Sequence, residues 1–154
     1  VLVAKQKPSV NENSDKLNNA TFIFILDKFI AGTLKAEGFV NGKKVVSSFI
    51  KTPEKASKIE LSYDLSSVPI NPKYPDMVFV YAKIVDANGT IIPTASNEVT
   101  FTLAEGNASL IGENPVKAEA GIATIVLKTN DLKKNIKLIA QSLNLQSGTI
   151  SVSK

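Results

Sequence analysis

Hydrophobic and polar residues alternate along much of the chain, and turn-forming residues interrupt the alternation roughly every 8 to 12 residues. In Val80–Ile84, small aliphatic residues at the even positions alternate with Tyr81 and Lys83, and the run ends at the strong turn signal Asp86–Gly89. After residue 52 the pattern predicts about seven short strands. The other segments that carry it are Ile59–Tyr63, Val99–Leu103, Ala123–Leu127, Ile136–Ala140 and Ile150–Val152.

Before residue 52 the same pattern predicts a smaller β unit. Phe and Leu alternate with Ile in Phe22–Leu26, which predicts a strand buried on both faces. Apolar and charged residues alternate in Leu34–Glu37, which predicts a strand with one solvated face. Asn41-Gly42 supplies the two positive-φ residues of a type I′ turn, and Val45–Lys51 is the predicted return strand.

Sequence signals for helices are weak. Ser57–Leu65 fits one face of a helix, but Ile59, Leu61 and Tyr63 have the period of a strand. Ser67–Asp76 contains three prolines, which predicts an irregular loop or a sheet edge. The chain is therefore predicted to be all-β.

A candidate domain boundary lies at Thr52-Pro53-Glu54-Lys55, where a proline and two charges separate two strand patterns. We predict a partial β-sandwich module in residues 1–52 and a second module in residues 53–154. About seven short strands suit an immunoglobulin-like sandwich, although the disulfide and Trp of antibody domains are absent from the sequence. The predicted fold class is all-β, with two immunoglobulin-like β-sandwich modules, the first partial.

The composition removes most familiar catalytic chemistry. The 154 residues include no Cys, no His and no Trp, and every one of the 18 basic residues is Lys. The chain cannot form a Cys/His zinc site, a Cys nucleophile or a Ser-His-Asp triad. We predict no catalytic, substrate-binding or metal-binding residue and no cofactor.

Charge and hydropathy exclude two further kinds of partner. The net charge is a mild +4, and the arginines that usually contact bases are lacking, so nucleic-acid binding is not expected. No apolar run approaches the roughly 18 residues that a membrane span requires. Because the chain starts at Val1 rather than Met, and Val1–Ala4 is too short for the apolar part of a signal peptide, we expect a piece of a longer protein.

Some carboxylates have both a functional and a structural interpretation. Asp86 and Asn88 could offer oxygens to calcium, but the other ligands of a calcium loop are missing, so a hairpin turn is favoured. Solvated strand faces are also favoured for two glutamate pairs, because no pattern places either pair across a cleft. These pairs are Glu113 with Glu119, and Glu54 with Glu60.

A platform for stacking sugars would require Tyr63, Tyr74 and Tyr81 on one surface. Tyr74 lies in the proline-rich segment, Tyr63 at the end of an apolar strand and Tyr81 on the less apolar face of its strand. No spacing brings the three rings together. We expect glycan binding to be weak or absent.

Several segments resemble a known family. Gly32–Phe39, followed by Asn41-Gly42-Lys43, resembles the end of the small β-sandwich after the catalytic barrel in bacterial glycoside hydrolases of family 2, the β-galactosidase type. Val80–Ile92, which reads VYAKIVDANGTII, is similar to the C-terminal immunoglobulin-like module of these enzymes. Leu110–Pro115 and Ala120–Ala123 continue the similarity, which covers residues from about 29 to 154.

The resemblance implies a non-catalytic role. Family 2 enzymes hydrolyse glycosides with a pair of glutamates in a barrel that this chain does not contain, so no catalytic residue is carried over. The implied function is structural support or spacing of that barrel in a periplasmic or secreted enzyme. The implied partners are the barrel and the other domains of the parent chain.

Two other protein classes share part of the pattern. A bacterial adhesin stalk of the invasin type also has immunoglobulin-like repeats with a V-D-A-N-G turn, repeated at a spacing of about 90 residues. Residues 1–52 contain no second copy of that turn. An independent carbohydrate-binding module would need the aromatic platform that the tyrosine spacing does not predict.

Overall fold

The computed structural model describes residues 1–8, 16, 22–65, 69–70, 74–130 and 135–153. Apart from a single 3₁₀ position at Lys16, their regular secondary structure consists of β-strands, which confirms the all-β prediction. Within these residues no helix is long and apolar enough to cross a membrane. The chain divides into two units, residues 1–32 and residues 33–154.

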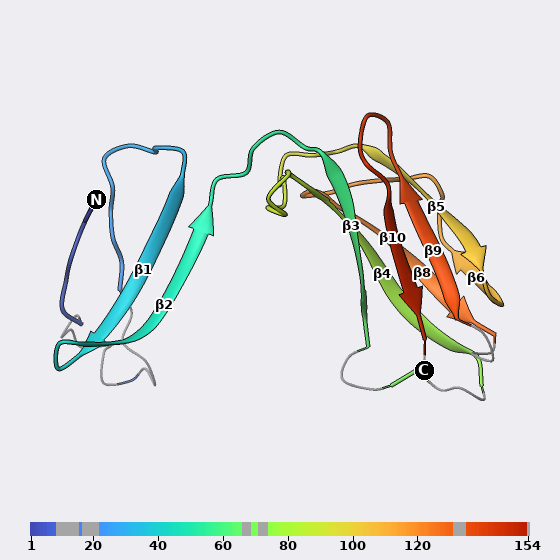
Figure 1. The fold of residues 1–154 in the computed structure, drawn as a ribbon, viewed down its shortest axis with the longest axis horizontal. Helices are drawn as coiled ribbons and strands as arrows, with labels where there is room; N and C mark the ends of the chain where they lie inside the picture. Colours follow the sequence, from blue (N-terminus) through green and yellow to red (C-terminus); the bar gives the residue numbers. More distant parts are fainter. Residues whose placement is uncertain (9–15, 17–21, 66–68, 71–73, 131–134, 154) are drawn as a thin grey trace. The chain divides into compact units, whose positions relative to one another are not determined.

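The first two strands form an antiparallel hairpin (Figure 1). β1 (Thr33–Val40) pairs with β2 (Lys43–Lys51). Asn41 and Gly42 connect them with φ values of 48° and 78°, as the predicted type I′ turn requires.

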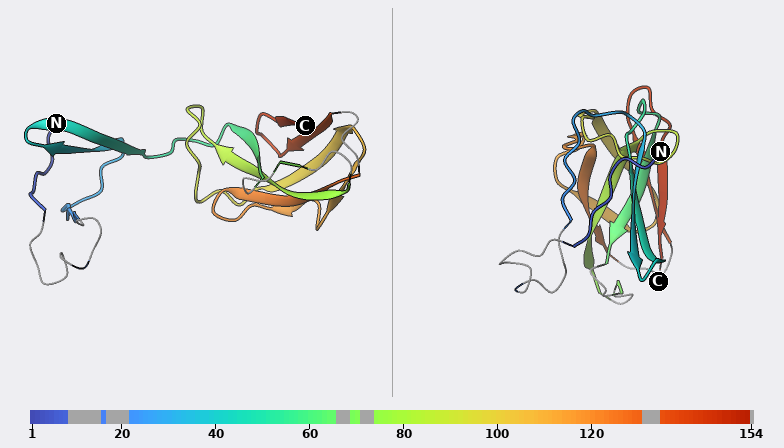
Figure 2. Two further views of the ribbon diagram at one scale, coloured as in Figure 1. Left: turned by 90° about the horizontal axis from the view of Figure 1, so that it is seen from below. Right: turned by 90° about the vertical axis from the view of Figure 1, so that its left-hand side faces the viewer.

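The remaining strands form two four-stranded sheets (Figures 1 and 2). One sheet has the order β3-β4-β8-β6 and the other the order β10-β9-β5-β7, with antiparallel pairing within both. The described residues after residue 52 form eight strands where the sequence predicts about seven, and the β-sandwich architecture is confirmed. The strands are β3 (Lys58–Asp64), β4 (Asp76–Val85), β5 (Glu98–Glu105), β6 (Ala108–Ile111), β7 (Val116–Lys117), β8 (Ile122–Thr129), β9 (Ile136–Gln141) and β10 (Gly148–Val152).

Alternate residues of these strands fill the space between the two sheets. Phe101 of β5 is the largest fully buried side chain, and it packs with aliphatic residues from both sheets. The predicted inward positions of β4, β5, β8 and β9 are buried except Leu103 of β5, which is half-buried. The buried ones are Val80, Ala82, Ile84, Val99, Phe101, Ala123, Ile125, Leu127, Ile136, Leu138 and Ala140.

Backbone hydrogen bonds join the two sheets where β3 and β10 begin. The N–H of Ile59 donates to the carbonyl oxygen of Gln146 at 2.9 Å, and the N–H of Gln146 donates to that of Ser57 at 2.9 Å. A Cβ atom on Gly148 would lie 2.6 Å from the carbonyl oxygen of Ile59. Glycine is required there because the two backbones approach too closely for any side chain.

A side chain protects one edge of β5. β7 pairs only with Glu98 and Val99 of that strand. Two positions after Val99, the side-chain amide of Asn114 pairs with the backbone of Phe101. Its Oδ1 accepts from the N–H of Phe101 at 2.9 Å, and its Nδ2 donates to the Phe101 carbonyl oxygen at 2.8 Å. Asn114 therefore replaces a neighbouring strand at Phe101.

The prediction for Phe22–Leu26 is wrong. These five residues form no strand, and their side chains are between 43% and 90% exposed. Alternating side chains can give a strand two distinct faces, but a strand also needs a neighbour for its backbone hydrogen bonds. Among the described residues no strand pairs with this segment. Leu34 and Ala36, predicted on the buried face of their strand, are exposed as well.

The division into units falls after Gly32, so the predicted module boundary after residue 52 stays a prediction. One contact ties the start of the second predicted module to its sandwich. The backbone N–H of Glu54 donates to the carboxylate of Asp86 at 3.0 Å.

Truncation of the main core residue should reveal how far the sandwich depends on burial. Phe101→Ala should lower the free energy of unfolding by about 3–5 kcal/mol, because a large cavity opens between the sheets. Thr100→Ala is the matched control, since Thr100 is the exposed neighbour in the same strand. Its cost should be less than half as large. Urea titrations measure both, and equal losses would mean that the register of β5 is wrong by one residue.

Candidate functional site

The buried carboxylate of Asp86 accepts three main-chain hydrogen bonds. Its Oδ1 accepts from the N–H groups of Asn88 (2.9 Å) and Thr90 (2.8 Å), and its Oδ2 accepts from that of Glu54. The Asp86 side chain is fully buried. Both oxygens accept hydrogen bonds from main-chain donors, so the residue holds a turn together.

The same hydrogen bonds determine the charge state of Asp86. The Glu54 N–H holds the pKa of the Asp86 carboxyl below its usual range, and the Thr90 and Asn88 N–H groups and the charge of Lys51 act in the same direction. Burial opposes them without cancelling the effect. Asp86 therefore remains ionised in the folded protein at neutral pH.

The predicted glutamate pairs belong to the surface. Glu54, Glu113 and Glu119 are exposed, and the exposed Glu60 forms an ion pair with Lys58 at 2.9 Å. No group of three or more Asp, Glu, His or Cys residues lies close enough to hold a metal ion in the part of the chain that the structure describes.

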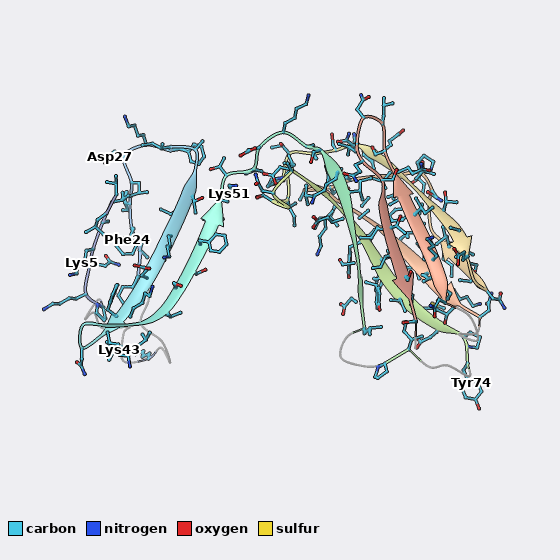
Figure 3. The ribbon with its side chains drawn as sticks, viewed as in Figure 1. Lys5, Phe24, Asp27, Lys43, Lys51 and Tyr74 are labelled. Atoms are coloured by element: carbon cyan, nitrogen blue, oxygen red, sulfur yellow. The ribbon has the colours of Figure 1, made fainter. Side chains whose placement is uncertain are left out.

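The three tyrosines lie on different surfaces. Tyr63 pairs with the buried Val80 and packs against the core, whereas Tyr81 lies on the opposite face of the same sheet. Tyr74 is 66% exposed, and its ring points away from the sheets just before β4 (Figure 3). The rings form no common platform.

A hollow of about 350 Å³ lies where β3 and β10 meet. Its charged side chains are Lys58 and Glu60, which neutralise each other. The hydroxyls of Ser147 and Thr149 also line it.

The sequence interpretation missed two exposed residues on β4. Met77 and Phe79 are 65% and 54% exposed. Both occupy the face of Tyr81, because they precede it by four and two positions. Extending the predicted alternation of β4 backwards would have placed them there.

Comparison with known proteins connects this sandwich to one enzyme family. A family model described as glycoside hydrolase family 2 C-terminal domain 5 matches residues 59–151, a range that begins in β3 and ends in β10. The chain belongs to glycoside hydrolase family 2. The resemblance seen in the sequence is thereby confirmed.

Two curated relatives agree with this membership. The chain is 34% identical to a β-galactosidase of Thermoanaerobacter pseudethanolicus over 110 residues, which cover 71% of this chain and 14% of that protein. It is 31% identical to a β-galactosidase of Bacteroides ovatus over 139 residues, which cover 82% of this chain and 16% of that protein. The chain thus spans about a sixth of the length of these family 2 relatives.

A solved structure shares the fold. A family 2 member from Bacteroides cellulosilyticus superposes with a TM-score of 0.66 at 22% identity, covering 81% of this chain and 19% of that one. The matched region of family 2 is a C-terminal domain, and the all-β residues described here include no part of a catalytic barrel. The chain is therefore an accessory part of a family 2 protein rather than its catalytic centre.

The lowered pKa of Asp86 predicts a dependence of stability on pH. A carboxylate with a depressed folded-state pKa stabilises the fold above its unfolded pKa of about 3.9, and this contribution disappears as the pH falls through the folded pKa. Asp86→Asn should therefore lower the urea midpoint at pH 7, and the midpoints of variant and wild type should converge in acid.

The exposed substitution Glu113→Gln serves as the control for the loss of one negative charge. Its effect at pH 7 should be several-fold smaller than that of Asp86→Asn. Equal effects, or a constant gap between Asp86→Asn and wild type down to the lowest pH at which both fold, would contradict the assigned role of Asp86.

Proposed function

We propose that this chain is a non-catalytic β-sandwich part of a β-galactosidase-type glycoside hydrolase that cleaves O-glycosidic bonds, and that it supports or spaces the catalytic barrel. The observation that carries the proposal is the family 2 C-terminal domain match across the whole sandwich. Its partners are the barrel and the other domains of the parent chain.

The chemistry of the described side chains supports this role. A retaining glycosidase needs two carboxyl groups about 5–5.5 Å apart, one of them as acid/base and the other as nucleophile. The buried Asp86 spends its oxygens on backbone donors, and Glu60 is paired with Lys58. These carboxylates act in the architecture of the fold.

The hairpin supports the proposal of a partial first module in residues 1–52. One of its faces carries Leu34, Val46 and Ile50, which are 52%, 62% and 70% exposed. On the other face, Glu37 forms ion pairs with Lys35 at 2.8 Å and Lys44 at 3.4 Å. Phe39 and Phe49 on that second face are 57% and 72% exposed, so both faces of the hairpin carry uncovered apolar side chains. A lone two-stranded hairpin is marginally stable, so this one belongs in a larger sandwich.

We assign the parent enzyme to the periplasm or the outside of the cell. The relatives are bacterial enzymes. The chain has no Cys, so its stability does not depend on the redox state of the compartment.

The purified chain should hydrolyse no glycoside. Aryl galactosides, glucuronides and mannosides should release chromophore at the rate of a buffer blank, whereas the full-length enzyme under the same conditions should turn over at least one of them. A mock purification from cells without the expression plasmid controls for host enzymes. Turnover that follows the chain through two different columns would contradict the proposal.

The chain should also bind glycans no more tightly than about 1 mM, or about −4 kcal/mol. Tight sugar sites combine an aromatic face with several fixed hydrogen-bond partners, and the three tyrosines lie on separate surfaces. Calorimetry with simple galactosides and plant or algal polysaccharides measures this affinity. Micromolar binding that Tyr74→Ala or Tyr81→Ala abolishes would instead make the chain a carbohydrate-binding module.

A further inference from the structure

The outer faces of the two sheets differ in chemistry. The sheet β10-β9-β5-β7 presents a polar outer face whose one large apolar residue, Ile139, is half-buried. The other residues of that face are Glu98, Thr100, Thr102, Lys117, Lys137, Gln141, Thr149 and Ser151. Such a face suits contact with water.

The outer face of β3-β4-β8-β6 is instead crossed by apolar side chains. Phe79 of β4 pairs with Val126 of β8, and Val126 pairs with Ile111 of β6, so the three side chains form one row across three strands. Phe79 is 54% exposed, Ile111 is 44% exposed and Val126 is half-buried. Directly opposite residues lie about 5 Å apart, which makes the row continuous.

Two more residues extend this row along β4. Met77 and Tyr81 lie two positions on either side of Phe79, and Met77 is 65% exposed. Lys128 is the cross-strand neighbour of Met77, and Thr124 is that of Tyr81. An apolar centre with a polar margin is the usual make-up of a protein interface.

We propose that this apolar outer patch, consisting of Met77, Phe79, Tyr81, Ile111 and Val126, is the face through which the sandwich docks onto the preceding part of its own parent polypeptide. The inference rests on the proposed function and adds the docking face to it. Relatives of the chain are about six to seven times as long as the region they share with it, so covalently linked protein is available as the occupant. A tethered neighbour meets the patch at a high effective concentration.

The composition of the patch favours this occupant over a glycan. Its centre is a row of Phe, Val and Ile, which provides apolar area but no hydrogen-bond partner for hydroxyl groups. Sugar sites need both. A surface of the parent enzyme with its own aliphatic residues matches the row, and the polar opposite face leaves the other side of the sandwich in water.

Met77 is the one methionine of the sequence and therefore a built-in probe of the patch. Hydrogen peroxide converts an accessible methionine to its sulfoxide, and mass spectrometry of the peptide gives the rate. We expect Met77 to be oxidised at least ~10-fold more slowly in the full-length protein than in the 154-residue chain, because docking covers the patch. Thr100→Met is the matched probe on the polar outer face, and its added methionine should be oxidised at the same rate in both proteins.

A second variant tests the patch itself. Phe79→Lys places a charge in the row, so Met77 of the full-length protein should regain the oxidation rate seen in the 154-residue chain. Thr102→Lys on the opposite face should leave Met77 protected. The circular dichroism and urea midpoints of the 154-residue variants show whether either substitution disturbs the fold, and Phe79 is exposed enough to accept lysine.

Equal Met77 rates in the two wild-type proteins would overturn the proposal. Slow oxidation in the 154-residue chain that accelerates on dilution would assign the patch to a second copy, and protection that appears only with added oligosaccharide would assign it to a glycan. Both results overturn the proposal as well. A full-length protein without hydrolase activity but with a protected Met77 would refute the proposed function and leave the docking face intact, so the two failures are distinguishable.

Discussion

Burial of two apolar sheet faces against each other is the constraint on which the sandwich depends. The chain has no disulfide, and its described residues contain no metal cluster, so Phe101 and the aliphatic residues around it supply the cohesion. Because side chains alternate between the faces of a strand, this burial fixes the register of each strand. A slip of one residue would exchange Phe101 for Thr100 in the core.

Much of this arrangement could be predicted from the sequence, because the two inner faces are strictly alternating. Val80–Ile84 and Val99–Leu103 have the predicted inward residues, and Asn41-Gly42 forms the predicted turn. Alternation alone did not suffice for Phe22–Leu26, because pairing depends on a partner strand that local sequence does not specify. The apolar patch was missed because Met77 and Phe79 share the outer face of β4 with Lys83, while Ile111 and Val126 come from β6 and β8.

The polar contacts that complete the fold were less predictable. Asp86 has the sequence context of a turn, but its hydrogen bond with the backbone N–H of Glu54, 32 positions earlier, is visible only in the structure. Asn114 joins Phe101, which lies 13 positions away. These hydrogen bonds form because the fold brings distant residues together. The sequence around Asp86 or Asn114 therefore does not reveal the partner. Candidate sites read from sequence therefore need the geometry of all their neighbours.

The side-chain amide of Asn114, which pairs with the backbone of Phe101, can be lost over the chemical lifetime of the protein. The Asn114 amide pairs with Phe101 because it is donor and acceptor at once. Conversion to a carboxylate would replace the Nδ2 donor by an acceptor oxygen that faces the carbonyl oxygen of Phe101. Spontaneous loss of the amide usually begins with attack by the backbone nitrogen of the next residue. Here that residue is Pro115, whose nitrogen carries no hydrogen. Asn114, which covers the edge of β5 at Phe101, is thus followed by proline, the residue type that blocks this loss of the side-chain amide.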